Sequence, residues 1–265
     1  MKYGAADARL EAIHARLASA GFLTVADLAA TIGVSEMTVR RDLARLAAAD
    51  RVRLVHGGAQ ATEAVPREGS FLHRQLQNET AKDAIASAAA ALIGPQDSIA
   101  IDAGSTALRV LERLDPGFAG SIVTHSVPAI VTAMERGRYR VIALGGDLFR
   151  DSAALVGPLA TDAAARLRVR TLFLGAAAID SRGVYVAADI ERPAKRALMT
   201  VADRVILLAD HTKFSRSAPV LLCGLDALDV LVTEQPVAEP IRAALISAGV
   251  AIVVTSLIRS EDTSA

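Results

Sequence analysis

The stretch Ser35-Glu36-Met37-Thr38-Val39-Arg40-Arg41-Asp42-Leu43 decides how the first part of the chain folds. Ser35 is a residue type that commonly caps the start of a helix. Val39, Leu43 and Leu46 recur at helical spacing, so they predict a helix that buries one apolar face. A helix seated in this way leaves its opposite face available for a partner.

The outward face of this predicted helix carries hydrogen-bond donors. With 3.6 residues per turn, Arg41 and Arg45 face outward, and Thr38 and Arg40 lie on the flanks. Arginine can bind guanine O6 and N7 with two donors or clamp a phosphate, and threonine can meet a base edge. The alternative is that the arginines only solvate a surface helix. The residues predicted to contact DNA are Ser35, Thr38, Arg40, Arg41, Arg45, Arg53 and His56.

Two more helices and a β-wing are predicted around this helix. Apolar residues at helical spacing between Leu10 and Leu17 indicate a first helix, and Thr24 is the expected N-cap of a second. After the third helix, Arg51–Val55 is expected to form a strand and His56–Gly58 a turn. The predicted fold of residues 1–60 is therefore a small α+β winged helix-turn-helix, with Arg51, Arg53 and His56 extending the DNA contacts.

From residue 70 onward, helical stretches alternate with short β-rich runs. Residues 61–69, which include Pro66 and several charges, are typical of a linker, so the predicted domains are 1–60 and 70–258. Such alternation is typical of an α/β domain with a mostly parallel sheet and helices on both faces. The predicted strands are Ser98–Ile101, Ser121–Thr124, Arg140–Leu144, Thr171–Leu174, Val205–Ala209, Val230–Val232 and Ala251–Val254.

Polar residues follow several of these strands, where open α/β sheets bind their ligands. Gly104-Ser105-Thr106 also opens a helix, which suits an anion, although an ordinary strand-to-helix turn would have the same sequence. Lys213 or Lys195 could supply a cation for a phosphate. Asp102 and Asp210 could accept hydrogen bonds from sugar hydroxyls. The residues predicted to bind a phosphorylated sugar are Asp102, Gly104, Ser105, Thr106, Thr124, Ser126, Gly145, Gly146, Lys195, Asp210 and Lys213.

The residues between Leu28 and Ala59 also carry a resemblance to a known family. In order, Leu28–Ala30, Val34–Leu43, Leu46 and Arg53–Ala59 resemble the DeoR family of bacterial repressors. The resemblance implies that this segment is a winged helix-turn-helix that binds DNA. One departure is Asp50, which stands where the family usually has glycine, and it affects the expected angle of the wing.

The second part of the chain resembles the sensor domain of the same family. The motifs that carry the resemblance are Asp102–Thr106, Thr124–Ser126, Leu144–Gly146, Glu191 with Lys195, Arg196 and Met199, and Asp210–Phe214. Arg74 and Lys82 match as well. The resemblance implies a fold similar to ribose-5-phosphate isomerase and an effector that is a phosphorylated sugar. His125 and Thr212 stand where the family often has Asn and Ser, so the particular sugar cannot be carried over.

Composition limits the other classes of protein. Lys+Arg and Asp+Glu both number 29, so any basic surface must be local. A single cysteine, Cys223, favours a reducing cytoplasm. Met1–Gly4 lacks the apolar core of a signal peptide, and Leu245–Ile258 is shorter than the roughly 20 residues of a membrane helix. His125 and His211 have no second His or Cys at ligand spacing, so neither a metal site nor a cofactor is predicted.

The sequence therefore predicts a cytoplasmic repressor of sugar-catabolic genes that binds double-stranded operator DNA and responds to a phosphorylated sugar. We expect neither a membrane protein nor an enzyme. We expect a homo-oligomer, because paired half-sites require two recognition helices. A second hypothesis is a sugar-phosphate isomerase-like enzyme, with Asp102, Asp147, Asp189 or Asp210 as its base. A third is a module whose N-terminal helices bind another protein.

Overall fold

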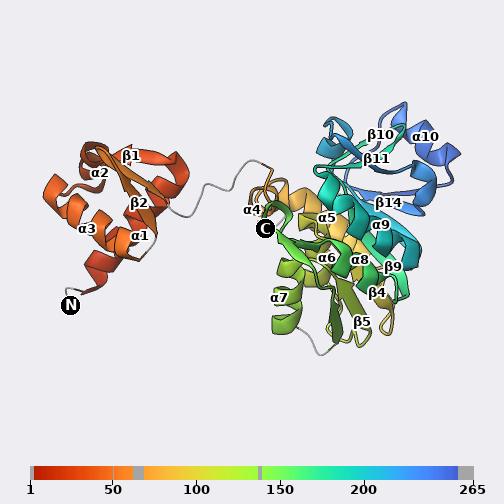
Figure 1. Cartoon of the computed structure of the whole chain (residues 1–265). Helices are drawn as coiled ribbons and strands as arrows, with labels where there is room; N and C mark the ends of the chain where they lie inside the picture. The colour runs from red at the N-terminus through yellow and green to blue at the C-terminus, as the bar shows by residue number, and fades with distance from the viewer. Residues whose placement is uncertain (1–2, 50, 62–68, 137–138, 256–265) are drawn as a thin grey trace, which may run out of the picture. The chain divides into compact units, whose positions relative to one another are not determined.

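The computed structural model describes residues 3–49, 51–61, 69–136 and 139–255, and the chain divides into two units, Met1–His73 and Arg74–Ala265 (Figure 1). Most of the predicted linker and the departure at Asp50 lie outside the described residues.

The N-terminal unit is a winged helix, as the sequence predicted. Thr24 caps α2 by accepting a hydrogen bond from the Asp27 amide at 3.1 Å, and Gly33 ends this helix in the left-handed conformation. The three strands form an antiparallel sheet in the order β1-β3-β2. The elements are α1 (Tyr3–Ala20), β1 (Phe22–Thr24), α2 (Val25–Ile32), α3 (Glu36–Ala48), β2 (Val52–Val55) and β3 (Gly58–Ala61).

The core of this unit seats α3 by the face that its sequence pattern indicates. Val39, Leu43 and Leu46 are almost fully buried against Ile13 and Leu17 of α1, together with residues of α2 and the wing. The burial of these side chains holds α3 in a fixed rotation about its axis. The opposite face of α3 is therefore fixed toward solvent.

The C-terminal unit is built on a seven-stranded parallel sheet with the order β15-β14-β12-β9-β4-β5-β6. All seven predicted strands are present, and their bounds agree with the prediction to within three residues at each end. The α/β fold class with a mostly parallel sheet is thus confirmed. The strands are β4 (Ser98–Ile101), β5 (Ser121–Thr124), β6 (Arg140–Ala143), β9 (Val169–Gly175), β12 (Ala202–Leu208), β14 (Val230–Thr233) and β15 (Ala251–Val254).

Helices cover both faces of this sheet (Figure 1). Crossovers of the usual right hand place α6 and α7 on one face of the sheet, and α5 packs on the same face. They place α9 and α10 on the other face, where α8 packs on α9. The helices are α4 (Phe71–Gln75), α5 (Glu79–Ala90), α6 (Ser105–Glu112), α7 (Val127–Arg136), α8 (Pro158–Ala164), α9 (Arg192–Val201) and α10 (Ile241–Ser247).

Two small antiparallel elements were not predicted from the sequence. One is a hairpin of β7 (Asp147–Phe149) and β8 (Ala154–Val156). The other is a three-stranded sheet of β10 (Ala178–Asp180), β11 (Gly183–Val186) and β13 (Val220–Cys223). These strands have only three or four residues, too few for a clear alternation of polar and apolar side chains. Among the helices of the described residues, none is long and apolar enough to cross a membrane.

Candidate functional site

The recognition helix α3 directs its basic side chains to solvent. The Ser35 hydroxyl caps the helix by accepting a hydrogen bond from the Thr38 amide at 3.3 Å, and Thr38 is half-buried. Arg40 lies 3.5 Å from Glu36, one turn earlier, in an exposed ion pair. Such a pair is weak, so it leaves Arg40 available to a partner. The exposed side chains along this face and its flanks are those of Met37, Arg40, Arg41 and Arg45.

Two charged residues near α3 fasten the unit together instead of facing outward. Asp42 is fully buried, and Arg9 of α1 donates to it at 2.6 Å, which ties α3 to α1. Arg51 pairs with Glu11 at 2.6 Å. That Arg51 adds a donor for DNA stays a prediction, and such a contact would require this exposed pair with Glu11 to open. The exposed basic side chains on the wing are Arg53 and His56.

The parallel sheet changes its direction of growth between β4 and β9. From β4 the chain builds β5 and β6 on one side, and from β9 it builds β12, β14 and β15 on the other. Loops at the carboxyl ends of two such strands diverge, and ligands of open α/β sheets bind there. Asp102 follows β4 directly, and its Oδ2 accepts a hydrogen bond from the Gly175 amide at the end of β9 at 2.9 Å.

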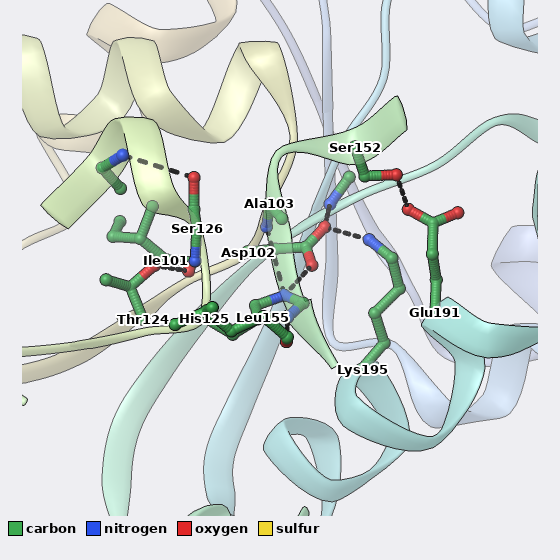
Figure 2. Close-up of polar contacts among 12 residues, drawn as sticks. Ile101, Asp102, Ala103, Thr124, His125, Ser126, Ser152, Leu155, Glu191 and Lys195 are labelled. Carbon is green, nitrogen blue, oxygen red and sulfur yellow. Dashed lines mark hydrogen bonds and ion pairs between the residues drawn. The ribbon is translucent and has the colours of Figure 1, made fainter. Parts of the chain in front are cut away.

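Asp102 is the centre of a buried polar network at this point (Figure 2). Lys195 of α9 donates to its Oδ2, and the Nε2 atom of His125 lies 3.0 Å from its Oδ1. The Nδ1 atom of His125 lies 3.1 Å from the carbonyl oxygen of Leu155 in β8. Burial alone would raise the pKa of Asp102, but the Lys195 charge and the His125 hydrogen bond hold it well below its usual range. Asp102 is therefore ionised, and it connects β4, β9, α9 and the hairpin.

Glu191 lies beside this network, with a different partner from the one its spacing suggests. Residues four apart on a helix often form an exposed ion pair, and the spacing of Glu191 and Lys195 is compatible with one. Both side chains are instead buried, Lys195 bonds Asp102, and Ser152 donates to Glu191 (Figure 2). Burial lowers the pKa of Arg74, and the negative charges of Glu191 and Asp102 oppose this shift, so Arg74 lies near both carboxylates.

A second cluster of charged side chains surrounds Asp210, after β12. The Oδ1 atom of Asp210 accepts hydrogen bonds from the Thr212 amide at 3.0 Å and from the Asn78 amide group at 3.2 Å. The pKa of Lys82 is lowered to about 8, mainly by burial; the charge of Asp210 opposes this shift, and the charges of Lys213, Arg109 and Arg74 add to it. The pKa of Lys213 is lowered too, first by burial. Several cations are thus crowded together in a partly desolvated site.

The remaining predicted ligand residues divide into three groups. Ser105 and Thr106 lie at the N-terminus of α6, after Gly104, with small exposed areas. Thr124 and Ser126 are fully buried: the Thr124 hydroxyl donates to the Ile101 carbonyl oxygen of the neighbouring strand β4, and the Ser126 hydroxyl accepts from the Ala129 amide. Gly145 and Gly146 lie in the loop between β6 and β7: Gly145 is exposed, whereas a Cβ atom on Gly146 would lie 2.2 Å from the Val156 carbonyl oxygen. Gly146 is therefore required by the packing of the hairpin.

Three residues around these clusters were missed by reasoning from the sequence. Asn78 bonds Asp210, and Ser152 bonds Glu191. Glu234 bonds the ring of His211 and accepts a hydrogen bond from the His211 backbone amide at 3.2 Å. Glu234 directly follows β14, so its position at a strand end could have indicated it. Asn78 and Ser152 lie outside the strand ends, and no comparable signal exists for them.

Family models match both units of the chain. The DeoR-like helix-turn-helix domain matches residues 9–65, and the DeoR C terminal sensor domain matches residues 77–235. The second match alone spans more than half of the chain. The family that the sequence motifs suggested is therefore the family that the models identify.

Relatives of known name agree with the family models. The chain is 28% identical to the uncharacterized HTH-type transcriptional regulator YgbI of Escherichia coli, over 93% of this chain and 96% of the relative. It is 32% identical to the transcriptional repressor AccR of Agrobacterium fabrum, over 80% and 83% of the two chains.

Among solved structures, ribose 5-phosphate isomerase A of Methanocaldococcus jannaschii aligns with a TM-score of 0.39 and 18% identity, over 52% of this chain and 55% of that one. The fold class rests on the topology of the sheet. The two family models and the relatives confirm the prediction of a DeoR-type transcriptional regulator with a sensor domain. The chain belongs to the DeoR family, as a DNA-binding transcriptional regulator with a C-terminal sensor domain.

Proposed function

We propose that this regulator represses sugar-catabolic genes and that its effector is a phosphorylated sugar bound where β4 and β9 diverge. One observation carries the proposal: four cationic side chains are buried or largely buried around three carboxylates at the carboxyl edge of the sheet. The cations are Arg74, Lys82, Lys195 and Lys213, and the carboxylates are Asp102, Glu191 and Asp210. Cations held this close together favour a multiply charged anion.

The division of labour among these groups follows from their partners. Lys195 is engaged by Asp102, whereas Arg74 and Lys213 both lower the pKa of Lys82, and Arg74 also lowers that of Lys213, so the phosphate belongs near these three cations. Ser105 and Thr106 at the α6 N-terminus add donors for the same anion. Asp210 would accept a sugar hydroxyl. We assign Thr124, Ser126, Gly145 and Gly146 to the shape of the surrounding loops.

At the DNA, Arg41 and Arg45 would enter the major groove, while Ser35, Thr38, Arg40, Arg53 and His56 contact its edges or the phosphates. Operators with paired half-sites require two copies of α3, so we propose that the protein acts as a homo-oligomer in the cytoplasm, where the DNA is. The effector must favour one arrangement of the two readers over another, because a ligand shifts an equilibrium only by its differential affinity.

The enzymatic alternative is disfavoured by the condition of its candidate bases. The pKa of Asp102 lies well below its usual range, because Lys195 and His125 outweigh the effect of burial, and the pKa of Asp210 is lowered as well. A general base works best with a pKa near the working pH. These two carboxylates are therefore suited to holding charge and accepting hydrogen bonds. We assign no catalytic residue.

A gel shift on the upstream region of the protein's own gene tests the proposal. The assay is repeated with ribose 5-phosphate, glucose 6-phosphate, fructose 6-phosphate and glycerol 3-phosphate, each beside its unphosphorylated parent. We expect the protein to shift the DNA, and at least one phosphate to change the shift where its parent does not. A shift that none of the phosphates alters would refute the effector assignment. Conversion of one phosphate into another by the protein would instead support the enzymatic alternative.

A further inference from the structure

Asn78 adopts a backbone conformation that its local sequence does not require. Its φ is +51° and its ψ is +42°, and Ala153 is the other non-glycine residue with positive φ in the described ranges. Non-glycine residues are uncommon in this left-handed region, although asparagine enters it more readily than most. Asn78 also stands directly before α5, where an Asn side chain usually caps the helix, and it makes no such cap.

The side chain of Asn78 is instead directed to a distant part of the chain. Its Nδ2 atom lies 3.2 Å from Oδ1 of Asp210 and 3.5 Å from Oγ1 of Thr212, more than 130 residues away in sequence. The left-handed backbone therefore places this amide against the turn that follows β12.

The two carboxylate oxygens of Asp210 have unequal environments. Oδ1 accepts three hydrogen bonds, from the Asn78 amide group, the Thr212 amide and the Thr212 hydroxyl. Oδ2 is buried and has no hydrogen-bond partner among the described residues. Asp210 as a whole is 1% exposed, and it is ionised because Thr212 and Lys213 outweigh the effect of burial on its pKa. A buried carboxylate oxygen without a donor is costly, so it points to a donor that a ligand supplies.

We propose that Asn78 is a positioning residue that gives the effector site its specificity for a hydroxyl-bearing ligand. This inference rests on the proposed function. With Oδ1 saturated by Asn78 and Thr212, only Oδ2 can accept a hydroxyl from the ligand. The nearby cations Lys82 and Lys213 hold the phosphate. The site then discriminates phosphate esters of polyols from other anions, because Asp210 repels an anion that brings no donor to Oδ2.

The experiment compares two ligands on the full-length protein by calorimetry. The first is the tightest binder among ribose 5-phosphate, glucose 6-phosphate, fructose 6-phosphate and glycerol 3-phosphate, and the second is sulfate, an anion without a hydroxyl donor. Asn78→Gly removes the amide while glycine tolerates positive φ, so the backbone is not strained. We expect its affinity for the sugar phosphate to fall roughly tenfold or more and its affinity for sulfate to stay within about twofold.

Two further variants make the result specific. Thr212→Val removes the hydroxyl donor of the same Oδ1 atom and should reduce the same ratio of affinities. Ala153→Gly changes the other left-handed residue, which bears no polar side chain, and should leave both affinities unchanged.

The inference is overturned if Asn78→Gly leaves the ratio of the two affinities unchanged, whether both affinities stay the same or both fall equally. An equal fall would mean that Asn78 has a structural role only. If the parent protein binds none of the four sugar phosphates, the proposed function fails together with the inference. If the parent binds one and Asn78→Gly keeps its discrimination, only the inference fails.

Discussion

The two units of this protein hold the cations that we propose to bind their ligands in opposite ways. In the N-terminal unit, which we call the reader, Arg40, Arg41 and Arg45 are exposed on a single helix. In the C-terminal unit, which we call the sensor, Lys82 and Lys195 are buried and come from different elements. DNA is a large polyanion that brings its own charge to the protein surface, and it binds exposed cations by releasing counterions. A small anion must be held by groups that are already oriented and partly desolvated.

This difference has a thermodynamic consequence. Exposed arginines contribute little to folding, so their removal leaves the reader folded. Buried charges must be compensated, so the residues of the sensor site also support its fold. Substitution of a DNA-binding residue in the reader should therefore leave its stability nearly unchanged. Substitution of a ligand-binding residue in the sensor should lower its stability as well.

The largest effect is expected from Lys195→Met. This change leaves Asp102, which is fully buried, without the cation that bonds its Oδ2. Breaking a buried ion pair from one side costs about 3–5 kcal/mol. We expect the free energy of unfolding of the sensor to fall by about that amount, as measured by hydrogen exchange of amides in β4 and β9 of the full chain.

The double variant Asp102→Asn with Lys195→Met is the control for this prediction. It removes both charges, so most of the lost stability should return, although effector binding should not. A single variant as stable as the parent would contradict the comparison, because a buried functional cation would then be independent of the fold.

The contrast between the units also explains how much the sequence revealed. The face of α3 was predicted correctly because helix periodicity is local: Val39, Leu43 and Leu46 fix which arginines point outward. The parallel strands were predicted because their sequences form short apolar runs, which in the five inner strands are mostly buried. Asp42 was not recognised as a buried residue, since its partner Arg9 lies 33 positions earlier.

Pairing in the sensor depends on contacts that no local pattern contains. Helical spacing suggested that Glu191 pairs with Lys195, but the true partner of Lys195 is Asp102, 93 residues away. The polar strand ends were recognisable, and the resemblance added Arg74 and Lys82. Asn78 could not be found, because its role depends on a single left-handed backbone conformation and a contact with a loop 132 residues later.

A smaller effect, confined to the DNA, is expected from Arg41→Ala. Loss of one arginine contact to a base should weaken operator binding by about 1–3 kcal/mol, or roughly 5- to 150-fold, at fixed salt. Sensor stability and effector affinity should not change. The matched control is Arg16→Ala, which removes an exposed arginine from α1. If Arg41→Ala binds the operator as tightly as the parent protein does, α3 is not the surface that reads the DNA.

The smallest effect concerns the pH dependence that burial gives to Lys82. Its pKa of about 8 lies below the usual value of 10.5. Between these two values the unfolded chain binds a proton that the folded chain has released, so the folding contribution of Lys82 becomes more favourable as pH rises. Anion binding has the opposite dependence, because it requires the charged ammonium. Above pH 8 the affinity for an anion should fall, by at most about tenfold per pH unit.

Sulfate is the suitable probe for this prediction, because its charge does not change between pH 7 and pH 9.5, whereas that of a phosphate could. We expect calorimetry to show sulfate affinity decreasing across this range, with proton uptake on binding. Lys82→Arg keeps a permanent charge, so its affinity should depend less on pH, and any remaining slope at high pH belongs to Lys213, whose pKa is also lowered. The same pH dependence in both proteins would show that Lys82 does not face the anion. In that case the contrast between buried cations in the sensor and exposed arginines in the reader would describe only where these side chains lie, and not how they bind their ligands.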